Sequence, residues 1–341
     1  MAKHAETSNT GPYFLGVDGG ASKTLAVVVD ADGNECGRGL GGSANYAAVG
    51  IKRALVGLKS AVQAAAEMAE CSLPFDAAWI GLAGIDRDQD CDILLPHLGD
   101  LATDIHLTND AELLLTALDD AVGVALIAGT GSIALGRDTQ GATARSSGWG
   151  HIAGDEGSGY DIGRMALQAA ARAADGRGEP TKLLDDILHH WNLSAPSDII
   201  GIIYQDDSKA RIARLTPLVF AAARSNDAAA RQIVAYAARE LALAARTVSE
   251  KLVFDGDQIP LALGGGMLLH ETYLREQVLI HLRETCTLGQ IALADQPALS
   301  AAQTAGKRPH PGTGPSGSPD GPVPAPPSGQ PLHILTNGEG N

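Results

Sequence analysis

The stretch between Gly123 and Gly163 constrains this chain more than any other part of it. It begins as an apolar segment at 124–128, turns through Gly129-Thr130-Gly131-Ser132 and returns as a second apolar segment at 133–135. Glycine in such a turn lets backbone N–H groups approach a ligand closely. The pattern therefore predicts a strand, a phosphate-facing turn and a second strand. The glycine-rich, acidic segment 148–159 is expected to form a polar wall of the same pocket.

A similar strand–turn–strand pattern lies near the N-terminus, where apolar segments flank the run Asp18-Gly19-Gly20-Ala21-Ser22-Lys23-Thr24. A Walker loop has glycine directly before its lysine and a helix after it, and neither condition is met here. The run is therefore interpreted as a hairpin turn whose N–H groups and hydroxyls can hold phosphate. Asp18 could hold Mg²⁺ directly or through water. The alternative is a tight hairpin in which Asp18 and Lys23 are merely solvated.

Two further strand ends carry candidate ligand groups. Asn109-Asp110 follows a short strand expected at 105–108 and precedes a helix expected from Ala111. Sheets of the α/β class place ligand groups at such positions, although Asp110 could simply cap the helix. Gly264-Gly265-Gly266 likewise lies between a strand at 260–263 and a helix at 268–282. Three glycines favour close approach of a ring or ribose, whereas a tight turn alone needs only one.

Helical periodicity and composition divide the remaining chain. Apolar residues recur at helical spacing over 51–70, and residues 208–252 are expected to form two alanine-rich helices. Further helices are expected at 161–174, 181–191 and 197–204. Residues 1–12 are polar and expected to be flexible. Residues 307–341 are rich in proline, glycine and serine, so they are expected to be disordered.

Charge and cysteine content narrow the class of protein. The formal net charge of −15 without a basic stripe argues against a nucleic-acid or anionic-membrane partner. A chain without a signal peptide or an 18-residue apolar run is expected to be cytoplasmic. The four cysteines are scattered and include no Cys-x-x-Cys pair, so neither a zinc ribbon nor a disulfide framework is expected.

Taken together in order, these motifs carry a resemblance that covers about residues 13–290. The chain resembles the N-acetylglucosamine and glucosamine kinases, which have the BadF/BadG-type ATPase fold of the sugar kinase, chaperone and actin superfamily. The motifs that match in order are Gly16-Val17-Asp18-Gly19-Gly20 with Ser22-Lys23-Thr24, Asn109-Asp110, Gly129-Thr130-Gly131-Ser132, Gly148-Trp149-Gly150-His151 with Gly154-Asp155-Glu156-Gly157-Ser158, and Gly264-Gly265-Gly266.

The resemblance implies an α/β fold of two ribonuclease-H-like domains, at 13–118 and 119–300, with a cleft between them. It implies transfer of phosphate from ATP, with Mg²⁺, to an amino sugar at its 6-hydroxyl, by a protein that is a homodimer. Asp110 falls on the catalytic base and Asp18 on the Mg²⁺ position. The ATP-binding positions are Gly19, Gly20, Ser22, Lys23, Thr24, Gly129, Thr130, Gly131, Ser132, Gly264, Gly265 and Gly266. The sugar-binding positions are Asn45, Asp110, Gly148, Trp149, Gly150 and Asp155.

Two departures from the family pattern matter. Ala83-Gly84 stands where some of these kinases have Ser-Gly, which leaves the exact sugar open. The segment 296–302 matches the family's closing turn only in part, so a short final helix is expected.

Three other functions fit the motifs less well. An ATPase that activates a 2-hydroxyacyl-CoA dehydratase would need grouped cysteines for an iron–sulfur cluster. A sugar-sensing repressor would bind DNA, which the negative charge disfavours. A Rossmann dehydrogenase would need a helix after the turn at 129–132, where the residues indicate a strand.

Overall fold

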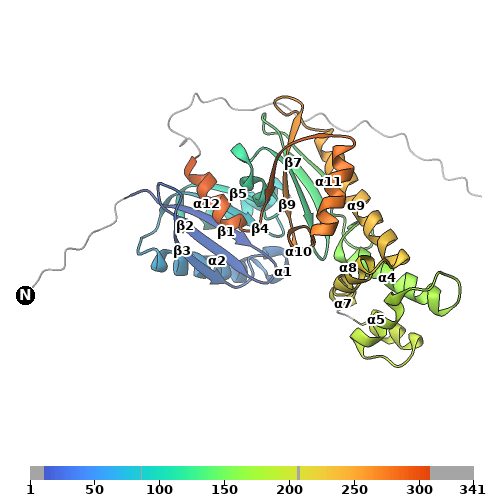
Figure 1. The fold of residues 1–341 in the computed structure, drawn as a ribbon. Helices are drawn as coiled ribbons and strands as arrows, with labels where there is room; N and C mark the ends of the chain where they lie inside the picture. Colours follow the sequence, from blue (N-terminus) through green and yellow to red (C-terminus); the bar gives the residue numbers. More distant parts are fainter. Residues whose placement is uncertain (1–10, 86, 206–207, 308–341) are drawn as a thin grey trace, which may run out of the picture. The chain divides into compact units, whose positions relative to one another are not determined.

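Two mixed five-stranded sheets organise the residues that this computed structural model describes, which are 11–85, 87–205 and 208–307 (Figure 1). The first sheet has the strand order β3-β2-β1-β4-β5. Strand β1 pairs antiparallel with β2 and parallel with β4. The strands of the first sheet are β1 (Phe14–Gly19), β2 (Thr24–Val29), β3 (Glu35–Gly41), β4 (Phe75–Leu82) and β5 (Ala102–Asn109).

The second sheet repeats this arrangement in the order β10-β9-β6-β7-β8. Strand β6 pairs antiparallel with β7 and parallel with β9, as β1 does with β2 and β4. Both strand–turn–strand predictions are therefore confirmed. The strands of the second sheet are β6 (Gly123–Ala128), β7 (Ser132–Arg137), β8 (Thr143–Ser147), β9 (Gln258–Gly264) and β10 (Thr287–Leu293).

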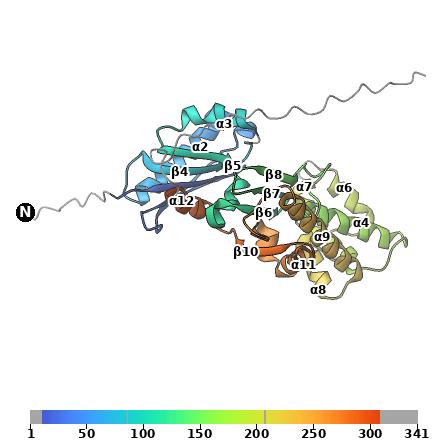
Figure 2. The same cartoon turned by 90° about the horizontal axis from the view of Figure 1, so that it is seen from above.

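Helices cover both faces of the first sheet. Helix α2 packs against β2 and β3, whereas α12, from the end of the described chain, packs against β1, β2 and β4. Figure 2 shows α2 and α12 on opposite sides of these strands. The helical segments that precede or follow these strands are α1 (Tyr46–Val49), α2 (Ile51–Met68), α3 (Asp88–Leu94), η1 (Leu95–His97), η2 (Glu112–Ala117), η3 (Asp119–Ala121) and α12 (Pro297–Lys307).

The second sheet carries a larger helical layer built around the 22-residue α9, which packs against β6, β7 and β8. Helices α4, α8 and α11 pack on α9 in turn. The helical segments of this layer are α4 (Gly159–Ala174), α5 (Lys182–Trp191), η4 (Pro196–Asp198), α6 (Ile199–Ile203), α7 (Ser208–Ala213), α8 (Thr216–Arg224), α9 (Ala228–Ser249), α10 (Gly266–His270) and α11 (Thr272–Arg283).

Several sequence expectations need correction. Residues 208–252 form three helices, α7, α8 and α9, because a separate short helix precedes Thr216. The helix expected from Ala111 is the 3₁₀ segment η2. The short strands β8 and β10 were not predicted. Both lie at an edge of the sheet and consist of exposed or half-buried residues, so their sequences do not alternate regularly between apolar and polar residues. The closing helix α12 has 11 residues and four buried alanines.

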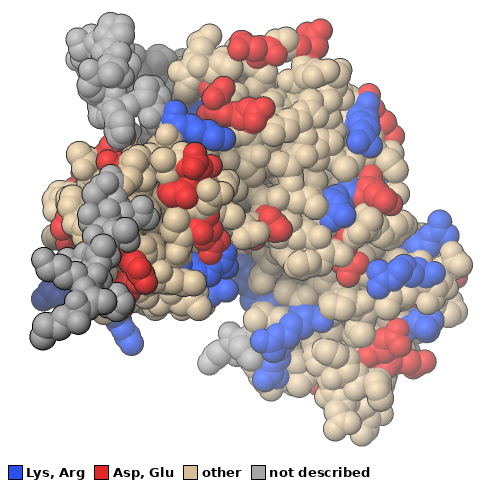
Figure 3. Space-filling model, turned by 60° about the vertical axis from the view of Figure 1, so that its left-hand side comes forward, with Lys and Arg blue, Asp and Glu red and all other residues tan. Residues whose placement is uncertain are grey.

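Some features lie at or beyond the limits of the description. The expected flexible N-terminus falls outside the described residues apart from positions 11 and 12, as does the expected tail apart from Lys307, which ends α12. No helix in the described ranges is long and apolar enough to cross a membrane. On the described part of the face in Figure 3, acidic and basic side chains are interspersed among uncharged ones.

Candidate functional site

The hairpin turn after β1 presents backbone donors. Its ends are tied by a hydrogen bond from the Gly20 N–H to the Lys23 carbonyl at 2.9 Å, and the Gly20 carbonyl accepts from Ala44 at 3.3 Å. The hydrogen bonds among the described residues give the N–H groups of Ala21, Ser22 and Lys23 no acceptor. All three residues are exposed. The turn therefore offers consecutive N–H groups of the kind that bind phosphate oxygens.

The turn after β6 is anchored to the start of α4. The N–H of Gly159 donates to the Gly129 carbonyl at 2.8 Å, and that of Tyr160 donates to the Thr130 carbonyl at 3.2 Å. With these carbonyls facing α4, the N–H groups of Thr130 and Gly131 find no acceptor in the part of the chain that the structure describes. This turn and the one after β1 are thus similar in their surplus of donors.

Two of the hydroxyls expected to help bind phosphate, those of Thr24 and Ser132, have other partners. The buried Thr24 hydroxyl donates to the Gly42 carbonyl at 2.7 Å, and the buried Ser132 hydroxyl donates to the Glu156 carbonyl at 2.8 Å. Both bonds join a turn to the loop beside it. The backbone N–H groups are therefore the stronger candidates for phosphate contact.

Asp155 joins the acidic segment to the second turn. Its side chain is buried, and a Cβ atom built on Gly131 would lie 2.9 Å from Asp155 Oδ2. Lys209 Nζ on α7 lies 3.5 Å from the same oxygen. The structure thus places a carboxylate predicted to bind sugar directly against a turn predicted to bind phosphate. This contact is expected if segment 148–159 and the turn at 129–132 line the same pocket.

Trp149 projects from the same segment and is 72% exposed. The Arg145 guanidinium lies over its ring, 5.2 Å from the ring centroid, and Arg145 Nη2 donates to the Gly148 carbonyl at 3.1 Å. Positive φ angles of 73° at Gly148 and 82° at Gly150 make the tight turns on either side of Trp149. Sequence reasoning missed Arg145, because a single arginine in a polar strand carries no local signal.

At the end of β5, Asn109 and Asp110 have different roles. Asn109 Oδ1 accepts from the Ala111 N–H at 2.8 Å, and Asn109 Nδ2 donates to the Ile85 carbonyl at 2.7 Å. Asn109 therefore ties the end of β5 both to the residue that begins the next segment and to the loop after β4. The Asp110 backbone donates to the Leu82 carbonyl at 3.3 Å, so the residue lies beside the end of β4.

Asn45 precedes α1, and Asp18 lies near the end of β1. Asn45 Oδ1 caps α1 by accepting from the Ala48 N–H at 3.0 Å, and a Cβ on Gly84 would lie 2.6 Å from that oxygen. Asp18 is half-buried near the end of β1, where burial raises the pKa of its carboxyl group while the charge of Lys23 acts to lower it. The described residues include no group of three or more side chains placed to hold a metal ion.

The three consecutive glycines that begin with the last residue of β9 are not equivalent. A Cβ on Gly264 would lie 2.0 Å from Leu114 Cδ2, and one on Gly265 would lie 2.4 Å from the Ala128 carbonyl oxygen. Gly265 also has a φ of 79°. Packing therefore accounts for these two glycines, whereas Gly266 faces open space. Their contact with adenosine stays a prediction.

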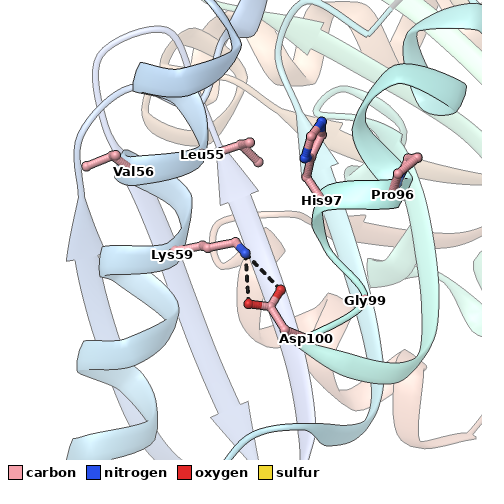
Figure 4. Close-up of a pocket in the computed structure, with 7 residues that line it drawn as sticks. All are labelled: Leu55, Val56, Lys59, Pro96, His97, Gly99 and Asp100. Carbon is pink, nitrogen blue, oxygen red and sulfur yellow. Dashed lines mark hydrogen bonds and ion pairs between the residues drawn. The ribbon is translucent and has the colours of Figure 1, made fainter.

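The described surface has several hollows, of which two are compared with the predicted site. One, of about 470 Å³, is lined by residues of both sheets, including Asn109, Ile133 and Arg145. The other lies between α2 and η1, where Lys59 Nζ contacts both carboxylate oxygens of Asp100 at 2.8 Å (Figure 4). None of the residues predicted to bind ATP, Mg²⁺ or sugar lines either hollow, but the first includes Asn109, which directly precedes Asp110, and Arg145, which lies over Trp149.

Comparison with known proteins identifies the family. The sequence profile of the BadF/BadG/BcrA/BcrD ATPase family matches residues 15–284. This chain belongs to that family.

Individual proteins similar to this chain include several named as amino-sugar kinases. An N-acetylmuramic acid/N-acetylglucosamine kinase of Clostridium acetobutylicum is 38% identical over 78% of this chain and 88% of its own length. An N-acetyl-D-glucosamine kinase of Dictyostelium discoideum is 30% identical over 74% of this chain and 84% of its own. A crystal structure of a Chromobacterium violaceum protein assigned as an N-acetylglucosamine kinase matches with a TM-score of 0.66 and 26% identity, over 84% of this chain and 98% of the other.

These comparisons confirm the predicted family resemblance and the two-domain α/β fold class. An ATPase family member uses ATP, so the ATP part of the cofactor prediction is confirmed as well. The roles of individual residues, the Mg²⁺ ion, the domain limits and the homodimer stay predictions.

Proposed function

We propose that this ATPase family member phosphorylates the 6-hydroxyl of an amino sugar, with Asp110 as the general base. The observation that carries the proposal is the pair of donor-rich turns, after β1 and after β6, at corresponding ends of the two sheets. The buried carboxylate of Asp155 packs against the second turn. The relatives named as amino-sugar kinases support the choice of substrate class.

The residues present fit ATP and Mg²⁺. The exposed N–H groups of Ala21, Ser22 and Lys23 and those of Thr130 and Gly131 would bind phosphate oxygens. Asp18, whose burial disfavours an uncompensated charge, would hold Mg²⁺ together with phosphate and water oxygens. Bound Mg²⁺ supplies neutralisation of the charge on the transferred phosphoryl group. Gly266 would leave room for the adenosine.

The sugar would lie between the two sheets' strand ends. Asn45, beside Gly84, and Asp155, beside Gly131, would bind its hydroxyl groups, and Trp149 would cover one face of the ring. Asp110 would accept the proton of the attacking hydroxyl, a role that typically contributes about 10²–10⁴-fold in rate. Closure of two domains over the sugar would exclude water, which otherwise would consume ATP.

The proposal includes the domain limits and the assembly. Residues 13–118 and 119–300 would form the two domains, with the first extended by α12, which packs on β1. The protein would be a cytoplasmic homodimer, a state that size-exclusion chromatography with light scattering measures directly.

A coupled assay with Mg-ATP tests the function over a panel of hexoses and amino sugars. Asp110→Asn is expected to lose at least about 10²-fold in kcat while sugar affinity, measured by calorimetry, is retained. Asp104→Asn, on the strand that ends just before Asp110, is the matched control and should keep normal turnover. Near-normal activity of Asp110→Asn would exclude Asp110 as the base. Absence of sugar-dependent ATP consumption in the wild-type protein would exclude the kinase itself.

A further inference from the structure

The hollow between the two sheets is unusual in its charge. Three arginines line it, Arg87, Arg137 and Arg145, in a chain whose formal net charge is −15. Glu112 is the single carboxylate among its lining residues that the structure describes. We call this hollow the arginine groove. A concave site with clustered positive charge raises the local concentration of anions.

The three arginines differ in how their charges are balanced. Arg137 Nη2 lies 2.6 Å from Glu112 Oε2, and Arg87 Nη2 lies 3.3 Å from Asp90 Oδ1. Arg145 instead donates to the Gly148 carbonyl and lies over the Trp149 ring. No carboxylate in the described ranges forms an ion pair with it. Arg145 therefore supplies the uncompensated charge of the groove.

The arginine groove adjoins the proposed sugar site from both sheets. Ile85 lines the groove and directly follows Gly84, which packs on Asn45. Asn109 lines it and directly precedes Asp110. From the second sheet, Ile133 lines it and lies under Gly148, where an added Cβ would be 2.7 Å from Ile133 Cδ1.

Arg145 therefore lies where the groove meets the loop that carries Trp149. A substituent on a sugar bound beside Trp149 would therefore lie close to the Arg145 guanidinium.

We infer that the arginine groove is an anion subsite for an acidic substituent of the sugar, and that Arg145 determines specificity for it. The inference rests on the proposed kinase function and narrows its substrate to amino sugars that carry a carboxylate, such as a lactyl ether on a ring hydroxyl. The planar guanidinium of Arg145 presents paired donors that match a carboxylate. Its stacking on Trp149 holds it in place, so little side-chain entropy is lost on binding.

The test compares N-acetylmuramic acid, which carries a lactyl ether, with its methyl ester and with N-acetylglucosamine. The wild-type protein is expected to show a higher kcat/KM for the acid than for the ester. Arg145→Gln should lower the ratio of kcat/KM for the acid to that for N-acetylglucosamine about tenfold or more, because bonds to charged groups exceed neutral ones in strength. The ratio is the readout, since loss of the stack on Trp149 would affect both sugars.

Two further variants separate charge from folding. Glu112→Gln removes the carboxylate that neutralises Arg137, so it is expected to raise the same ratio. Arg177→Gln removes an exposed arginine on the helical layer, paired with Asp175, and should leave the ratio unchanged.

An equal effect of Arg145→Gln on both sugars would overturn the inference. So would phosphorylation of N-acetylglucosamine with no use of the acid. Inhibition by free lactate or phosphate that depends on Arg145, with no advantage of the acid over its ester, would assign the groove to a free anion instead. Failure of all three sugars would reject the kinase proposal, which is a distinct result.

Discussion

Substitution of Gly16 tests how the end of the described chain is held against its beginning. A Cβ built on Gly16 would lie 1.9 Å from the Ala298 carbonyl oxygen and 2.4 Å from the Ala302 nitrogen. Both atoms belong to the backbone of α12, so no side-chain rotation can relieve the clash. Gly16 has an ordinary extended φ, which alanine adopts equally well. Gly16→Ala must therefore displace α12 from β1.

The cost follows from what α12 buries. Its side chains Ala298, Ala301, Ala302 and Ala305 are at most 3% exposed, and they pack in one core with residues of both sheets. At about 0.8 kcal/mol for each buried methyl group, full displacement would cost about 3 kcal/mol. Overpacking of a core typically costs a similar amount, about 1–3 kcal/mol. For a chain of this size, a loss of about 3 kcal/mol lowers the melting temperature by about 5 °C.

Thermal unfolding followed by circular dichroism measures this shift. Gly99→Ala is the matched control, because no atom lies within 4 Å of an added Cβ there and its φ is not positive. The control should melt within about 1–2 °C of the wild-type protein, as surface substitutions usually do. Equal melting temperatures for Gly16→Ala and Gly99→Ala would refute the packing of α12 on β1.

Two predictions use pH to separate the roles of individual carboxylates. Burial raises the pKa of Asp18 despite Lys23, so its ionisation costs stability as pH rises above about 4. Asp18→Asn should match the wild-type protein at pH 3, exceed its melting temperature at pH 7 and lose Mg-ATP turnover. Burial acts to raise the pKa of Asp227, but hydrogen bonds from Ala230, Lys182 and Thr181 hold it below its ordinary value. Asp227→Ala should cost about 1–2 kcal/mol in urea unfolding at pH 7 and progressively less below pH 4.

Local patterns predicted the parts of the site that depend on neighbouring residues. Each hairpin was predictable because a glycine turn separates two short apolar segments, and the turn at 129–131 directly connects the paired strands β6 and β7. Contacts between distant segments were not predictable in the same way. The closing of α12 on Gly16 joins residues about 280 positions apart and depends on a missing side chain. Likewise, nothing in the sequence shows that Asn109 rather than Asp110 makes the bond to Ala111.

Comparison of the two sheets also shows why the two similar turns would bind different groups around one ligand. In the first half, Gly19 pairs with Thr24 and the preceding position is Asp18, whereas in the second half Ala128 pairs with Ser132 and the preceding position is Ile127. A carboxylate therefore lies within the strand only in the first sheet, where it can meet a cation.

In the second sheet, the carboxylate comes from a separate loop. Asp155 reaches the turn only because Gly131 has no side chain and the backbone of Asp155 adopts a φ of 59°. Its position beside the turn suits hydroxyl groups of a sugar better than a second metal ion, because Lys209 already lies 3.5 Å from its Oδ2 oxygen. If both turns bind phosphate as proposed, a carboxylate within the first strand and a carboxylate from a separate loop beside the second turn are suited to placing a cation and an alcohol on opposite sides of the same phosphate group.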